Sequence, residues 1–157
     1  MTISLLLVGK TDHKQLDVLI DDYKKRLSFF VKLNIIVIPD LKKRKNMEIE
    51  LQKEKEGELI LSKISNSDFV VLLDENGLEH TSTKFASWLQ KRMNMGLKNL
   101  VFVIGGPYGF SPEVYARGNQ KLALSKMTFS HQMVRLFFTE QLYRAFSILN
   151  NQPYHHE

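Results

Sequence analysis

The feature that most constrains the fold of this chain is the alternation of short apolar runs with segments whose apolar residues recur at helical spacing. The apolar runs lie at residues 3–8, 34–38, 69–73, 100–104 and 122–124, and they lack regular polar alternation. Strands of this kind are typical of a sheet that is covered on both faces. The order of strands and helices therefore predicts an α/β domain with a mainly parallel sheet and helices on both faces.

Segments with helical spacing fill the intervals between these runs and follow the last one. The chain of 157 residues contains no internal repeat and no interdomain linker, so we expect a single domain over residues 1–157. The expected helices lie at residues 15–27, 46–64, 82–95, 112–116 and 131–149.

Local signals predict where some of these elements begin and end. Asn46 is the expected N-cap of the second helix, and Gly57 interrupts its weak apolar stripe, which predicts a helix lying loosely on the surface. Asp74-Glu75-Asn76-Gly77 predicts a turn directly after the third strand. Ser82 or Thr83 is expected to cap the third helix.

Composition excludes some classes of site. The chain has no cysteine, which rules out a disulfide scaffold, a thiolate metal site and a cysteine nucleophile. No apolar run reaches membrane length and no secretory signal is present, so we expect a cytoplasmic protein without a membrane partner.

The formal net charge of +5 favours polyanionic partners. The densest group of cations is Lys42, Lys43, Arg44 and Lys45. Taken alone, this basic loop is as consistent with a solvated surface loop as with an RNA contact.

Ligands of parallel α/β sheets bind beyond the carboxyl ends of the strands, which directs attention to the loops after Leu73, Ile104 and Leu124. The segment 105–109 is rich in glycine but matches neither a dinucleotide fingerprint nor a P-loop, which argues against a nicotinamide dehydrogenase. The segment 125–130 offers hydroxyl groups and free main-chain amides that suit a nucleoside. A plain turn explains the first segment equally well, and an ordinary loop capped by Ser130 is the better explanation of the second when it is taken alone.

The last helix is apolar on more than one face, which predicts a subunit interface as well as a core contact. Glu140 and Arg144 are four residues apart and can pair on one side of this helix. A structural ion pair and an arginine held at an active site are equally consistent with this spacing.

Five ordered motifs make the chain similar to a known family. They lie at residues 103–109, 122–128, 131–135, 140–145 and 153–155. Together they resemble the RlmH family, SPOUT-superfamily methyltransferases of 23S ribosomal RNA, and the resemblance covers the whole chain in length and element order. It implies a SPOUT-type α/β knot, with a C-terminal trefoil knot, and a homodimer.

The resemblance also implies S-adenosylmethionine (SAM) as cofactor, bound in the knot by three loops. Many relatives carry proline where this chain has Ser130, so the last of these loops is expected to be less rigid here. The implied contacts are Leu73, Gly106, Ser125, Lys126, Met127, Thr128, Phe129 and Ser130.

The implied reaction transfers the SAM methyl group to N3 of a pseudouridine in 23S rRNA of the assembled ribosome. No metal is required, and the adjacent His155 and His156 do not have the spacing of a zinc site. We expect His155 to accept the imide proton, Tyr154 to position the base and Arg144 to stabilise the developing anion. Proton transfer to water, aided by Arg144 alone, is the alternative.

Two other functions compete with this one. A SPOUT enzyme that methylates another RNA position would share the cofactor site and differ in the chemistry of its tail. A non-enzymatic ribosome-associated or assembly factor would keep only a vestigial SAM site.

Overall fold

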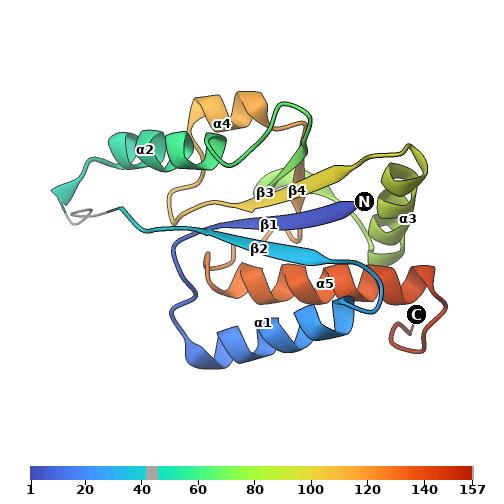
Figure 1. The fold of residues 1–157 in the computed structure, drawn as a ribbon. Coiled ribbons are helices and arrows are strands. Elements are labelled where there is room, and N and C mark those ends of the chain that lie inside the picture. The colour runs from blue at the N-terminus through green and yellow to red at the C-terminus, as the bar shows by residue number, and fades with distance from the viewer. Residues whose placement is uncertain (42–45, 157) are drawn as a thin grey trace.

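A computed structural model describes residues 1–41 and 46–156. In this part of the chain, all strands are parallel and form one sheet in the order β2-β1-β4-β3-β5 (Figure 1). The predicted α/β class with a parallel sheet is confirmed, whereas the trefoil knot and the single-domain boundaries stay predictions. The elements are β1 (Thr2–Val8), α1 (Lys14–Leu27), β2 (Leu33–Ile38), α2 (Ile49–Leu61), β3 (Phe69–Glu79), α3 (Ser82–Asn94), β4 (Asn99–Ile104), α4 (Pro112–Arg117), β5 (Gln120–Ala123) and α5 (Met133–Leu149).

Helices cover both faces of the sheet, with α1, α3 and α5 on one side and α2 and α4 on the other (Figure 1). Successive residues of β1 alternate between the two cores, because side chains of a strand point to opposite faces. Leu5 and Leu7 belong to the core under α3 and α5, and Leu6 belongs to the core under α2 and α4. Double coverage explains the lack of polar alternation in the strands.

The third strand does not end where the sequence predicted. Leu73 and Leu78 both pair with Leu122 of β5, so the residues between them bulge out of the ladder and β3 then continues to Glu79. A Cβ atom at Gly77 would lie 2.6 Å from the main-chain nitrogen of Leu122, so only glycine allows this return to β5. The predicted turn at residues 74–77 is wrong: the segment is a bulge inside a strand.

The second helix also differs from its prediction. It begins at Ile49 after Glu48, so Asn46 is not its N-cap. It does not lie loosely, because a Cβ atom at Gly57 would be 2.4 Å from Ser111 Oγ. Gly57 thus marks a close helix contact rather than a weak point.

The third helix begins at Ser82, and its N-cap is Thr81, one residue before the nearer of the two expected caps. The Oγ1 atom of Thr81 accepts a hydrogen bond from the main-chain N–H of Lys84 at 3.2 Å. Its extended backbone places the hydroxyl to satisfy one free amide of the first turn. Three adjacent hydroxyl residues, Thr81, Ser82 and Thr83, offer the same chemistry, and the sequence alone predicted the wrong one.

The last helix packs against both α1 and α3. Phe138 and Leu142 are completely buried, while Met133 and Phe137 remain 37% and 40% exposed. The predicted subunit interface on α5 stays a prediction. No helix within residues 1–41 and 46–156 is long and apolar enough to cross a membrane.

Candidate cofactor pocket and C-terminal cluster

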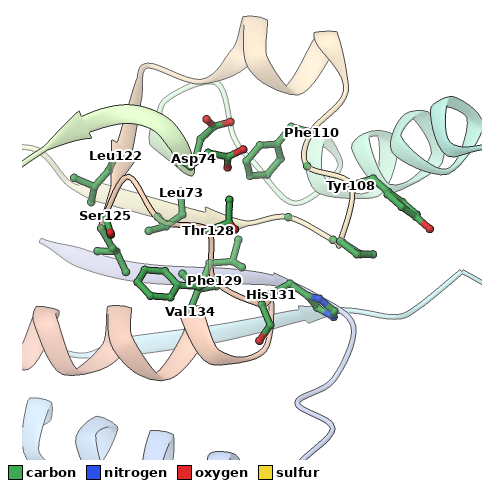
Figure 2. Close-up of a pocket in the computed structure, with 18 of the residues that line it drawn as sticks. Leu73, Asp74, Tyr108, Phe110, Leu122, Ser125, Thr128, Phe129, His131 and Val134 are labelled. Atoms are coloured by element: carbon green, nitrogen blue, oxygen red, sulfur yellow. The ribbon is translucent and has the colours of Figure 1, made fainter.

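A cavity of about 490 Å³ lies between the bulge of β3 and the carboxyl ends of β4 and β5 (Figure 2). Its volume is in the range of about 300–1,000 Å³ that is typical of small-molecule sites. The bulge after Leu73 and the loops after Ile104 and Leu124 form it, at the three positions that the strand-end rule selected. Seven predicted contacts line it, while Lys126 is exposed outside the lining; the seven are Leu73, Gly106, Ser125, Met127, Thr128, Phe129 and Ser130.

The glycine-rich loop after β4 forms one wall of this cavity. Its chain folds back on itself, since Gly109 donates a hydrogen bond to the carbonyl of Gly106 at 3.2 Å and adopts a φ of 79°. A Cβ atom at Gly106 would lie 2.5 Å from the buried carboxylate of Glu56 on α2. Gln52 donates to that carboxylate at 2.8 Å. Helix α2 thus supports the loop from behind, and a side chain at Gly106 is excluded.

The loop between β5 and α5 forms the opposite wall. Ser125 Oγ accepts a hydrogen bond from the Met127 N–H at 3.0 Å, which folds the start of the loop. Ser130 Oγ accepts from the Met133 N–H at 3.1 Å, but α5 begins at Met133 and its N-cap is Gln132, so the predicted N-cap at Ser130 is wrong by two residues. Thr128 and Phe129 lie between these two turns, and both border the cavity (Figure 2).

Arg135 fixes the end of this loop to the end of β1. The side chain is completely buried and donates to the carbonyls of Val8, Gly9 and His131 at 2.7, 3.0 and 3.0 Å. Burial lowers the pKa of its guanidinium, and the nearby Asp12 and Asp40 carboxylates oppose that shift. The end of β1 and the motif at residues 131–135, far apart in the chain, therefore meet at one side chain.

Gln132 reinforces the same junction. Its Nε2 donates to the carbonyl of Lys10 at 3.1 Å, and its Oε1 accepts from the Asp12 N–H at 3.0 Å. His131, the residue before it, lines the cavity. The contacts between the end of β1 and residues 131–135 therefore hold His131, and with it this part of the cavity wall, in place.

Asp74 and Tyr115 belong to the cavity, and the sequence did not single them out as cofactor contacts. Both line it, and the hydroxyl of Tyr115 donates to Asp74 Oδ2. Burial, followed by this hydrogen bond, raises the pKa of Tyr115 above its ordinary value. The bulge after Leu73 places Asp74 on the wall of the cavity. The sequence predicted a turn at residues 74–77 and therefore gave no reason to expect Asp74 there.

The three expected catalytic residues cluster around Glu140 of α5. Arg144 pairs with its carboxylate at 2.6 Å, and Tyr154 donates to it at 2.9 Å. Arg144 also lies 4.8 Å from the centre of the Tyr154 ring and 3.4 Å from His155 Nδ1. The tail after α5 thus folds back onto the helix and joins all three residues.

This C-terminal cluster (Glu140, Arg144, Tyr154 and His155) is separate from the cavity of its own chain. None of its members lines the cavity. Arg144 follows the lining residue Val134 by ten positions, roughly 15 Å along a helix. The structure therefore brings together the expected cofactor residues in one place and the expected catalytic residues in another. The basic loop, Lys42 to Lys45, lies outside the described residues.

Comparison with known proteins decides the family. A family model described as "Predicted SPOUT methyltransferase" matches residues 1–155. Relatives named "Ribosomal RNA large subunit methyltransferase H" are 65% identical in Christiangramia forsetii, over 99% of both chains, and 61% identical in Flavobacterium johnsoniae, over the full length of both. A relative of the same name in Phocaeicola vulgatus is 55% identical over the full length of both chains.

The chain belongs to the RlmH family of SPOUT methyltransferases. The family predicted from the five motifs is thus confirmed, and with it the class of enzyme. Residues 1–41 and 46–156 contain no group of three His, Cys, Asp or Glu side chains that could hold a metal ion. Family membership does not assign roles to individual residues, so those roles belong to the proposal below.

Proposed function

We propose that this RlmH-family protein transfers a methyl group from SAM to N3 of a pseudouridine in 23S rRNA of the assembled ribosome. The observation that carries the proposal is the cavity between the β3 bulge and the ends of β4 and β5, lined by the two loops that the family motifs occupy. The relatives' name, large-subunit rRNA methyltransferase, supports the substrate class over nearly the full chain.

The residues of the cavity suit SAM as the cofactor. The loops after β4 and β5 offer main-chain N–H and C=O groups, by which a nucleoside can be recognised. Gly106 borders the cavity with main-chain atoms only, and Glu56 fills the space into which a side chain at this position would point. Leu73, Phe129 and Val134 supply apolar surface for a flat base. Lys126 lies outside the lining, so we assign it to the mouth of the site rather than to its wall.

When bound, SAM supplies an electrophilic methyl group: the N3–carbon bond forms as the carbon–sulfur bond breaks, the electron pair of that bond stays on sulfur, and the N3 proton leaves to a base. The protein's task is alignment of the two reactants and removal of this proton. We assign proton removal to His155 and stabilisation of the anion to Arg144.

Glu140 gives the C-terminal cluster its shape. Its carboxylate holds Arg144 and the Tyr154 hydroxyl at the same time. Burial, then the hydrogen bonds to Tyr23 and Glu140, raises the pKa of Tyr154 above its ordinary value. Tyr154 therefore stays protonated at neutral pH and acts as a hydrogen-bond donor or stacking surface, not as the base.

A homodimer lets the two sites meet. Because no member of the C-terminal cluster lines the cavity of its own chain, we propose that the tail of one subunit acts next to the cavity of the other. The partly exposed apolar residues Met133 and Phe137 of α5 are available for such an interface.

The test uses methyl-labelled SAM with intact 70S ribosomes, separated subunits and naked 23S rRNA in parallel, followed by mass spectrometry of the nucleosides. We expect incorporation in the large-subunit rRNA of the ribosome, as N3-methylpseudouridine. Labelling of a ribose hydroxyl or of another base would contradict the proposed target atom. Absence of both SAM binding and incorporation would instead support a non-enzymatic assembly factor.

A further inference from the structure

The cavity wall is acidic, although the protein is basic overall. Asp74 and Glu75 both line it, and no Lys or Arg is found among its described lining residues. The formal net charge of the whole chain is +5. Local charges dominate the potential inside a cleft with low-dielectric walls. The pocket therefore favours a cationic ligand, whereas the net charge of the protein favours an anionic partner.

Asp74 is the better fixed of the two carboxylates. Its Oδ1 accepts a hydrogen bond from the Asn76 N–H at 2.8 Å, and its Oδ2 accepts from the Tyr115 hydroxyl. Glu75 is exposed, whereas Asp74 is half-buried beside Phe110 on the cavity wall (Figure 2). A carboxylate held by two donors is preorganised, and its field acts on the ligand without reorientation.

We propose that Asp74 makes the pocket selective for a cationic ligand, so that SAM binds more tightly than its product S-adenosylhomocysteine. This inference rests on the proposed function. SAM carries one positive charge more than the product, because a sulfonium becomes a neutral thioether when the methyl group leaves. Since the two molecules otherwise share almost every atom, a charge on the wall is an effective means to distinguish them.

In turnover, Asp74 is expected to affect the binding of SAM and the release of product, but not the rate of methyl transfer. Asp74 stabilises the charged cofactor before reaction and loses that attraction afterwards, so it favours exchange of product for fresh SAM. It does not add stabilisation that exists only in the transition state, and its removal is expected to raise KM for SAM without lowering kcat. Asp74 is thus a specificity-determining residue and not part of the proton-transfer machinery.

The test is titration calorimetry of the wild type and Asp74→Asn with three ligands. These are SAM, S-adenosylhomocysteine and sinefungin, in which an amine-bearing carbon replaces the sulfonium. Asparagine keeps the size of the side chain and an oxygen for Tyr115. We expect the preference for SAM over the product to fall by about tenfold, or about 1.4 kcal/mol, with sinefungin following SAM and the product little affected.

Two matched variants remove the same charge elsewhere. Glu75→Gln acts on the exposed carboxylate of the same wall, and Asp21→Asn acts on the exposed side of α1, outside the lining. We expect a smaller effect for the first and none for the second. In the wild type, added salt should also narrow the difference between SAM and product.

An unchanged SAM-to-product ratio in Asp74→Asn, or an equal change in Glu75→Gln, overturns the assignment to Asp74. A wild-type preference that does not respond to salt overturns the electrostatic origin. Each of these results leaves SAM binding, and hence the proposed function, intact. Failure of the wild type to bind SAM at all is a different result, because it removes the proposed function itself.

Discussion

The guanidinium of Arg135 lies 2.7 Å from the carbonyl oxygen of Val8, across 127 positions of the chain. Val8 ends β1, and Arg135 stands in the first turn of α5, just after the loop that borders the cavity. The side chain is completely buried, and its partners are main-chain carbonyls and the Thr11 hydroxyl. This one residue therefore links the carboxyl end of β1 to the wall of the proposed SAM site.

Arg135→Met should destabilise the fold strongly. The substitution leaves the buried carbonyls of Val8 and Gly9 without their donor, and each such group costs about 1–3 kcal/mol. We expect a loss of roughly 3 kcal/mol or more in the free energy of unfolding, measured by urea denaturation. The matched control is Arg26→Met, which breaks an exposed pair with Asp22 and should change stability little. An equal loss in the free energy of unfolding for the two variants would show that the buried hydrogen bonds of Arg135 stabilise the fold no more than an exposed ion pair does.

Much of the fold was predictable, because the short apolar runs are uninterrupted and alternate with segments of helical spacing. The cofactor loops were predictable as well, since the strand-end rule depends only on strand order. The bulge at Asp74 was not predictable, because its residues are typical of turns and only the pairing of Leu78 with β5 shows otherwise. The buried role of Gly57 was hidden for a related reason: its partner, Ser111, is distant in sequence.

Gly77→Ala tests whether the bulge supports the cavity. The new methyl group would meet the main chain of Lys121 and Leu122, which cannot move without disturbing β5. We expect both lower stability, by about 1–3 kcal/mol, and weaker SAM binding by calorimetry. Gly96→Ala is the control: its φ of 74° is unfavourable for alanine, but no atom lies within 4 Å of the added group. That variant should lose stability and keep its affinity for SAM; similar SAM binding in both variants would separate the bulge from the site.

His155→Ala tests the proposed proton acceptor. Single-turnover methyl transfer on ribosomes should slow by about 10²–10⁴-fold, the usual contribution of a general base, while SAM binding stays unchanged. His156→Ala is a close control, because it removes the same side chain one position later, where the residue is exposed. Undiminished transfer by His155→Ala would eliminate this base and favour proton transfer to water aided by Arg144.

Mixed dimers test whether the tail acts on the partner's cavity. A subunit with Gly77→Ala has a damaged cavity and an intact tail, and a subunit with His155→Ala has the reverse. If the site is shared, co-expressed and purified heterodimers should recover up to about half of the wild-type activity per dimer, because one composite site combines the two intact parts. Heterodimers no more active than a mixture of the parent homodimers would place the tail and the cavity of one chain in the same site.

Neutralising the basic loop tests its contact with rRNA. Each phosphate contact that is lost should make the dependence of log K on log salt shallower by about one. Lys42→Gln combined with Lys43→Gln should therefore weaken ribosome binding and flatten this slope by up to about two if both lysines contact phosphates. Lys91→Gln combined with Lys98→Gln lowers the net charge by the same amount at exposed positions at the end of α3 and just before β4. If the two double variants share one slope, the effect belongs to net charge alone; if the loop variant keeps the wild-type slope, the loop does not contact the phosphates.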